Sequence, residues 1–276
     1  MGNFTGSKMT AIPIIVSGAR GRMGSAILRL AANDPSFTIV AALANPEKVS
    51  TETVHLRVDG TDLEVPLHRN LAECSPPNGC LLIDFTTPEA SRQYGEQVVR
   101  YNMGLICGTT GLSASDHQTF LRASVSVPVL VASNMSLGVA VLADTARRLA
   151  AALPEHDLEI VEMHHRHKKD APSGTALILA EAAAEGRSVS LNDTVKYGRQ
   201  GHTGARPPGE IGIHALRGGD IVGDHRLIFA TDGECIEIAH RATSRDTFAA
   251  GALRAARFIA GKPAGSYTMR DVLGLA

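Results

Sequence analysis

The chain has 276 residues, of which 44% are hydrophobic, so it can bury one large core or two modest ones. Its 27 basic and 28 acidic side chains give a net charge of −1, which provides no general attraction for nucleic acid or an anionic membrane. The apolar runs are too short to cross a membrane and the first ten residues lack the apolar core of a signal peptide, so we expect a cytoplasmic protein.

A glycine-rich turn follows the first predicted strand. Residues 12–17 are apolar, the turn reads Gly18-Ala-Arg-Gly-Arg-Met-Gly24, and residues 25–32 form an amphipathic helix. Glycines at such a turn let the backbone approach a pyrophosphate, whose charge the helix N-terminus stabilises. A second strand at 37–43 completes a βαβ unit. The pattern favours a dinucleotide-binding turn over an ordinary tight turn.

Three more apolar strands are predicted at residues 80–85, 104–107 and 127–132. Each ends in small or polar residues, and an open α/β sheet binds ligands at the carboxyl ends of its strands. Together with the glycine-rich turn, these strand ends predict a nucleotide-binding crevice. Residues 44–70 are polar and irregular, with a short edge strand predicted at 61–66.

The second half of the chain has a different pattern. A long helix is predicted at 137–150, and antiparallel strands at 210–216 and 221–230 are joined by a turn at 217–220. Asp232-Gly233 predicts a hairpin to a strand at 235–241, and a helix follows at 247–260. We therefore predict an α/β protein: a Rossmann-like dinucleotide-binding domain (1–136), a substrate-binding α+β domain with an open mixed sheet (137–243), and a C-terminal helix returning to the first domain (244–276).

Most of the plausible chemistry lies in one polar run, His164-His-Arg-His-Lys-Lys-Asp170. A turn and N-cap sequence, 172–175, then opens a strong helix former at 176–185. The amides of Gly174 and Thr175 at this helix start would bind an anion such as a carboxylate. Imidazoles and cations beside an anion site suit acid–base chemistry on an acidic small molecule.

The same run has two other interpretations. Charge runs often form solvated loops, and His165 and His167 would both ligate zinc if they lay on a strand. Arg166, Lys168 and Lys169 would repel a dication, so we predict no metal. The four cysteines lack metal-ligand spacing and are expected to be reduced thiols.

Several motifs together resemble those of one family over nearly the whole chain. They are residues 16–24, 83–86, 108–111, 162–175, 201–204, 217–225 and 269–273. These segments are similar to the bacterial 4-hydroxy-tetrahydrodipicolinate reductase (dihydrodipicolinate reductase) family. The resemblance implies NAD(P)H-dependent reduction of a cyclic dicarboxylate, 4-hydroxy-tetrahydrodipicolinate, to tetrahydrodipicolinate in lysine and diaminopimelate biosynthesis. It also implies a homotetramer formed through the second domain.

The resemblance further implies roles for individual residues. His164 and Lys168 match the acid–base pair, and His165 with the Gly174 and Thr175 amides matches the contacts to substrate carboxylates. The cofactor, NADH or NADPH, would contact three sets of residues: Gly18, Ala19, Arg20, Gly21, Arg22 and Met23; Gly108, Thr109 and Thr110; and Ala132, Ser133, Asn134 and Met135.

One departure from the family and two other functions remain open. An acidic residue often follows the second strand in the family, whereas this chain has Ala44-Asn45, so the ribose contact is not assigned unless Glu47 supplies it. The protein could instead be another nicotinamide-dependent imine or amino-acid dehydrogenase, or a non-catalytic NAD(P)H-sensing module. A sensor, however, has no use for a titratable His-Lys pair beside a carboxylate site.

Overall fold

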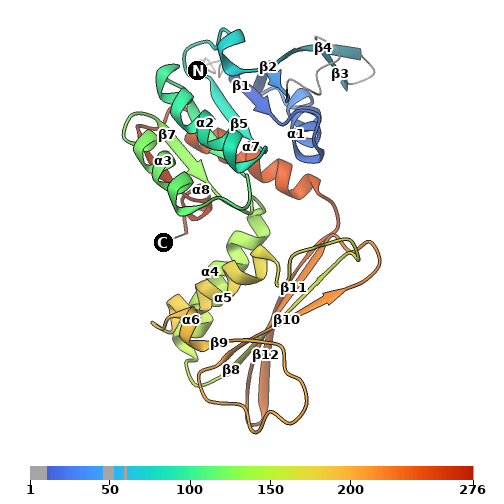
Figure 1. Ribbon diagram of the computed structural model, residues 1–276, viewed down its shortest axis with the longest axis vertical. Coiled ribbons are helices and arrows are strands. Elements are labelled where there is room, and N and C mark those ends of the chain that lie inside the picture. Colours follow the sequence, from blue (N-terminus) through green and yellow to red (C-terminus); the bar gives the residue numbers. More distant parts are fainter. Residues whose placement is uncertain (1–10, 46–52, 59–60, 276) are drawn as a thin grey trace, which may run out of the picture. The chain divides into compact units, whose positions relative to one another are not determined.

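The computed structural model describes residues 11–45, 53–58 and 61–275, which divide into two compact units. The first unit comprises the described residues up to Met135 together with Phe248–Val272, and the second comprises Ser136–Thr247 with the described residues from Leu273 onward. The predicted α/β class is confirmed: a parallel-rich, Rossmann-like sheet forms the first unit and a mixed sheet the second (Figure 1). No helix in the described ranges is long and apolar enough to span a membrane.

The first unit is built on one eight-stranded sheet of the described residues, in the order β13-β7-β6-β5-β1-β2-β4-β3. Its elements are β1 (Ile12–Ser17), α1 (Arg22–Ala32), β2 (Phe37–Leu43), β3 (Thr53–Val58), β4 (Thr61–His68), the 3-10 helix η2 (Leu71–Glu73), β5 (Leu81–Asp84), α2 (Pro88–Arg100), β6 (Gly104–Cys107), α3 (Ala114–Ser124), β7 (Pro128–Val131), α7 (Asp246–Ile259), β13 (Gly265–Tyr267) and α8 (Met269–Leu273). Neighbouring strands are parallel, except for the antiparallel hairpin of β3 and β4.

Strand order reverses at β1. Ser17, the last residue of β1, pairs with Leu43 of β2 on one side and with Asp84 of β5 on the other. Open α/β sheets bind ligands at the carboxyl ends of the strands where the order reverses. The glycine-rich turn after Ser17 therefore lies at the edge where a nucleotide site is expected.

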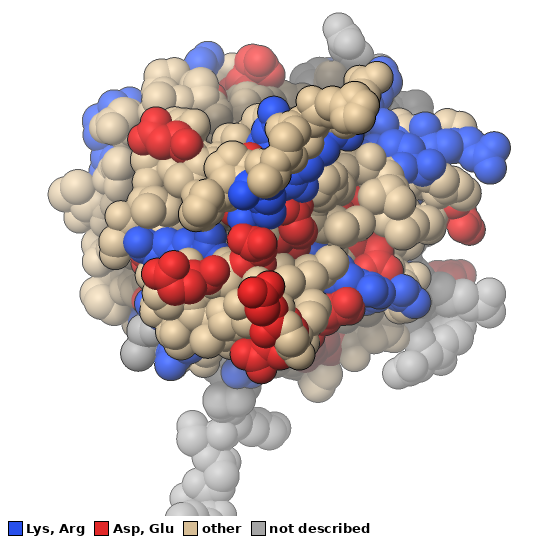
Figure 2. All heavy atoms as spheres, turned by 90° about the horizontal axis from the view of Figure 1, so that it is seen from below, with Lys and Arg blue, Asp and Glu red and all other residues tan. Residues whose placement is uncertain are grey.

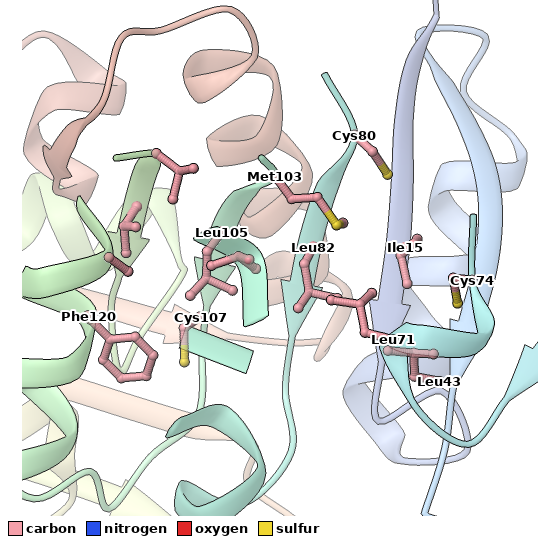
Figure 3. Close-up of a cluster of buried hydrophobic side chains, with 14 of the residues drawn as sticks. Ile15, Leu43, Leu71, Cys74, Cys80, Leu82, Met103, Leu105, Cys107 and Phe120 are labelled. Carbon is pink, nitrogen blue, oxygen red and sulfur yellow. The ribbon is translucent and has the colours of Figure 1, made fainter. Parts of the chain in front are cut away.

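The core of this unit contains apolar side chains of the central strands packed with those of α2 and α3. Ile15, Leu82, Leu105 and Phe120 lie together in it (Figure 3). Burying one such side chain contributes about 1.5–3 kcal/mol. Cys80 belongs to the same core, and burial raises the pKa of its thiol to about 12, so it stays protonated at neutral pH.

Helix α7 comes from the end of the chain and packs within the first unit. A Cβ at Gly251 of α7 would lie 1.7 Å from the carbonyl oxygen of Met135, so only glycine allows this approach. The Arg257 guanidinium lies 4.8 Å from the centre of the Phe37 ring and also pairs with Asp34. These contacts fix the C-terminal helix against β2 and the loop before it.

The second unit contains a five-stranded sheet of the described residues in the order β12-β11-β8-β10-β9. Its elements are α4 (Leu137–Ala152), β8 (Asp157–His164), α5 (Gly174–Gly186), α6 (Leu191–Thr194), β9 (Val195–Tyr197), β10 (Ile211–Arg217), β11 (Gly223–Thr231) and β12 (Glu234–Ala242). The predicted hairpin of residues 210–230 is wrong, because β8 lies between β10 and β11, parallel to the first and antiparallel to the second. The hairpin at Asp232-Gly233 is confirmed, and Gly233 has the positive φ (85°) that this turn requires.

The two faces of this sheet differ. Leu158 and Ile160 of β8 are buried with side chains of α4 and α5. On the opposite face, Glu159 accepts hydrogen bonds from Arg199 and Arg206. Mixed charges are also seen in Figure 2, where basic and acidic side chains are interspersed on the face viewed from below.

Candidate active site

The glycine-rich turn is shaped by two close backbone approaches. Gly18 has a φ of 72°, and a Cβ there would lie 2.5 Å from the carbonyl oxygen of Phe85, which follows β5. A Cβ at Gly24 in α1 would lie 2.2 Å from the carbonyl oxygen of Gly18. Gly21, which has no side chain, takes the N-cap position of α1. The start of α1 is therefore held directly against a bare backbone turn, as a pyrophosphate site requires.

The other two predicted cofactor segments follow β6 and β7 in the same sheet. The amide of Gly108 donates to the carbonyl of Asp84 (2.8 Å), and that of Ala132 donates to the carbonyl of Cys107 (3.0 Å). All three segments thus follow the carboxyl ends of strands of one sheet. Ala19, Thr109 and Met135 are buried, so their side chains do not face solvent. Exposed residues of the same set are Arg20, Gly21, Arg22, Thr110 and Ser133.

Asp84 organises this edge of the sheet, a role that the sequence did not predict. Its buried carboxylate accepts hydrogen bonds from Ser17 Oγ (2.6 Å), Thr86 Oγ1 (2.7 Å), Thr109 Oγ1 (3.3 Å) and the hydroxyl of Ser91. Ser17 ends β1, Thr86 follows β5, Thr109 follows β6 and Ser91 lies in α2. The sequence signal is an acidic residue ending an apolar strand, with hydroxyl residues after it.

His164 is the last residue of β8, and its imidazole is held by a buried carboxylate. Glu162 lies two residues earlier, and alternation along the strand places both side chains on the buried face. Nδ1 of His164 is 2.6 Å from Oε2 of Glu162, whose exposed fraction is 0%. Arg217 of β10 donates to both Glu162 oxygens at 2.8 Å, and the amide of Ser173 donates at 3.0 Å.

These contacts determine the ionisation of Glu162. Burial alone would raise its pKa, but hydrogen bonds from His164 and Arg217 outweigh burial and lower the pKa to about 2. Glu162 is therefore a carboxylate throughout the physiological range. As a carboxylate it can only accept hydrogen bonds.

Lys168 lies in the turn that follows β8. The amide of Lys168 donates to the carbonyl of His165 at 3.1 Å, and Nζ lies 2.8 Å from Oδ2 of Asp170. Arg217 donates to the carbonyl of Asp170 at 2.7 Å. Arg217 therefore joins the turn that carries Lys168 to the carboxylate that holds His164.

Helix α5 begins at Gly174, two residues earlier than predicted. Ser173 is the N-cap residue, and its hydroxyl accepts a hydrogen bond from the amide of Ala176 (3.2 Å). Gly174 is exposed, with open space where a side chain would stand. The Gly174 and Thr175 amides thus belong to the first turn of a 13-residue helix, where the dipole favours an anion.

His165 follows the strand and is half-buried. Burial and the neighbouring cation of Arg245 lower the pKa of its imidazole, so the neutral ring is favoured. Its Nδ1 atom is buried without a hydrogen-bond partner among the described residues. A neutral imidazole here could donate a hydrogen bond to a ligand carboxylate.

The part of the chain that the structure describes contains no group of three or more His, Cys, Asp or Glu side chains that could hold a metal ion. The ring centres of His165 and His167 are 6.3 Å apart. Lys168, the neighbour of His167, adds a positive charge that would oppose a dication.

A Rossmann-like unit with a bare glycine turn, together with a segment rich in histidine and lysine in a second unit, is the arrangement of an oxidoreductase that uses a nicotinamide cofactor. Residues 12–135 match the family model described as "Dihydrodipicolinate reductase, N-terminus", and residues 138–273 match "Dihydrodipicolinate reductase, C-terminus". The chain therefore belongs to the dihydrodipicolinate reductase family, as its motifs predicted.

Curated relatives agree with this assignment, and a solved structure shares the fold. The 4-hydroxy-tetrahydrodipicolinate reductase of Rubrobacter xylanophilus is 45% identical over 268 residues, covering 95% of this chain and 98% of that protein. The enzyme of the same name from Beijerinckia indica is 44% identical, covering 97% and 99%. A dipicolinate-bound dihydrodipicolinate reductase from Paenisporosarcina sp. TG-14 has the same fold, with a TM-score of 0.73 and 24% identity, covering 94% of this chain and 98% of that one.

Proposed function

We propose that the protein reduces 4-hydroxy-tetrahydrodipicolinate to tetrahydrodipicolinate with NADH or NADPH. The ring loses water, formed from the 4-hydroxyl and a proton of a neighbouring ring carbon, and gains one hydride and one proton. The observation that carries the proposal is the segment from His164 to Thr175, which combines a buried, carboxylate-held imidazole, a lysine ammonium and an exposed helix start. The family to which the chain belongs supports the same reaction.

The second unit supplies the groups that a cyclic dicarboxylate requires. The amides of Gly174 and Thr175 and the neutral ring of His165 would hold a carboxylate of the substrate. His164 and Lys168 would deliver the proton as negative charge develops on the conjugated imine. Both side chains lie on the segment that leads into the carboxylate-binding helix start, so binding orients the ring toward the proton donors.

The first unit has the features that a dinucleotide needs. The turn at Gly18 would accept the pyrophosphate against the start of α1, and the segments after β6 and β7 would contact the rest of the cofactor through their backbones. The bound nicotinamide supplies the hydride. Arg20 and Arg22 are exposed at the turn and would add positive charge near the phosphates.

We further propose a homotetramer formed through the second unit. In a single chain, β12 and β9 are the outer strands of the five-stranded sheet. Outer strands present backbone groups that can pair with another chain, and closed symmetric assemblies cover them.

A reductase assay tests the proposed reaction. The wild-type protein is mixed with freshly generated substrate and NADH or NADPH, and the nicotinamide absorbance is followed. We expect oxidation that depends on both protein and substrate and is inhibited by dipicolinate, a planar dicarboxylate. No oxidation in a protein that still binds NADH would instead favour a cofactor-sensing module.

A further inference from the structure

The segment from Arg217 to His225 belongs to the matched motifs, and the structure places it around His164. The amide of Gly218 donates to the carbonyl of His164 (2.9 Å), and the rings of His164 and His225 meet edge to face with centres 5.1 Å apart. A Cβ at Gly223 would lie 3.1 Å from Nε2 of His164, so glycine leaves space at that atom. The segment therefore packs on the imidazole, and Gly223 places no side chain against Nε2.

Nδ1 of His164 faces a different environment. It lies 2.6 Å from a Glu162 oxygen that also accepts from Arg217. An ionised carboxylate has no proton to donate, so the proton in this hydrogen bond must be on Nδ1. In the neutral ring, Nε2 is then the basic nitrogen. The carboxylate contact thus selects the tautomer with the proton on Nδ1, as a neighbouring hydrogen bond does for other functional histidines.

Arg217 makes this arrangement rigid. Its guanidinium contacts both oxygens of Glu162 in the two-point geometry that fixes a carboxylate plane. The Ser173 amide completes the set from the residue that caps α5. The same carboxylate therefore links the imidazole to the start of the helix proposed to bind the substrate.

We infer that Glu162 and Arg217 are positioning residues: Arg217 fixes the Glu162 carboxylate, and Glu162 holds His164 with Nδ1 protonated, so that Nε2 exchanges the proton with the substrate. This inference rests on the proposed function. It adds to that function the reactive atom of His164 and the two side chains that select it.

The chain offers a matched control. Glu159 lies on the same strand and, like Glu162, is held by arginine and histidine side chains. It accepts from Arg199 and Arg206, and His214 Nε2 lies 2.7 Å from its Oε2. These hydrogen bonds outweigh burial and lower the pKa of Glu159 to about 2. It faces the opposite side of the sheet from His164. Glu159→Gln therefore removes a similar ion cluster without touching the proposed active site.

The first experiment compares turnover with binding. Glu162→Gln is expected to lower kcat by about 10²-fold, within the range of positioned acid–base groups, while the Kd of dipicolinate changes by less than about threefold. Glu159→Gln is expected to retain kcat within about threefold, since it leaves the imidazole in place. A folded Glu162→Gln variant with near-normal kcat, or one that loses kcat and dipicolinate binding in equal measure, would overturn the inference.

The second experiment measures the wild-type protein itself. Nitrogen-15 NMR of wild-type protein with labelled histidine reports which ring nitrogen carries the proton, and the His164→Gln variant assigns the signal. We expect a proton on Nδ1 of neutral His164; a proton on Nε2 instead would contradict the inference even if Glu162→Gln does not fold. A wild-type protein with this tautomer but no reductase activity would refute the proposed function separately.

Discussion

Gly18 and Phe85 approach so closely that a single methyl group at Gly18 would lie 2.5 Å from the Phe85 carbonyl oxygen. The two residues follow β1 and β5, the strands between which the sheet reverses its order. The absence of a side chain at Gly18 therefore determines the shape of the proposed pyrophosphate site.

Replacing Gly18 by alanine should weaken cofactor binding. The new Cβ must displace the Phe85 backbone and is also strained at a φ of 72°. Gly261→Ala is the matched control. Gly261 has a φ of 74°, and a Cβ placed there would have no atom within 4 Å, so this substitution costs only the backbone strain of ~1–2 kcal/mol. We expect the Kd of NADH to rise at least ~10-fold in Gly18→Ala alone, measured by fluorescence titration. Equal effects of the two variants would show that the close approach is unimportant.

Both nicotinamide cofactors should be used. Ala44, directly after β2, is buried and its amide donates to the His68 carbonyl (3.1 Å), while Asn45 is exposed. A neutral Asn45 does not repel a 2′-phosphate as a carboxylate would. Glu47 and Lys48 lie outside the described residues. The test is kcat/KM for each cofactor under the same conditions, and a preference for NADH of ~100-fold, worth ~2.7 kcal/mol, would mean that an acidic residue contacts the ribose.

Acid should destabilise the second unit through two carboxylates. The pKa values of Glu159 and Glu162 are lowered from 4.5 to about 2, so their stabilising contacts are complete above pH ~4.5 and are lost as the pH falls toward 2. Each glutamine variant should therefore show a smaller loss of unfolding free energy between pH 6 and pH 3 than wild type. Denaturant unfolding across this pH range measures that loss. The same dependence of unfolding free energy on pH in both variants as in wild type would contradict the structure.

A homotetramer should persist in dilute solution. Light scattering at micromolar concentration should give four chain masses, because pairing through the second unit covers the outer strands β12 and β9. A stable monomer under these conditions would refute the proposed assembly.

The sequence predicted the Rossmann-like sheet because its strands are continuous apolar runs separated by a glycine turn and helices. It did not predict that β8 separates β10 from β11, because alternation shows which face of a strand is buried but not which strand lies beside it. The edge strand predicted at 61–66 corresponds to β4, but its hairpin partner β3 was missed because residues 53–58 lie in a polar stretch that resembles a loop.

The candidate site shows the same limit. The polar run 164–170 was noticed because seven polar residues in succession cannot all enter a core, and the resemblance to the family then pointed to His164, His165 and Lys168 within it. Arg217 was missed as a partner of Glu162 because the two are 55 residues apart and meet only once β8 and β10 pair. Glu162 itself could have been found, since a carboxylate two residues before His164 on a strand must share its face.

The most direct test of the central claim compares two neighbouring lysines. Lys168 is tethered to Asp170 and is proposed to act with His164, whereas Lys169 is exposed. Lys168→Met should lower kcat for the freshly generated substrate by ~10²–10⁴-fold and leave the Kd of NADH unchanged, while Lys169→Met should behave like wild type. Near-normal turnover in Lys168→Met, or an equal loss in both variants, would contradict the assignment of this segment as the reactive centre.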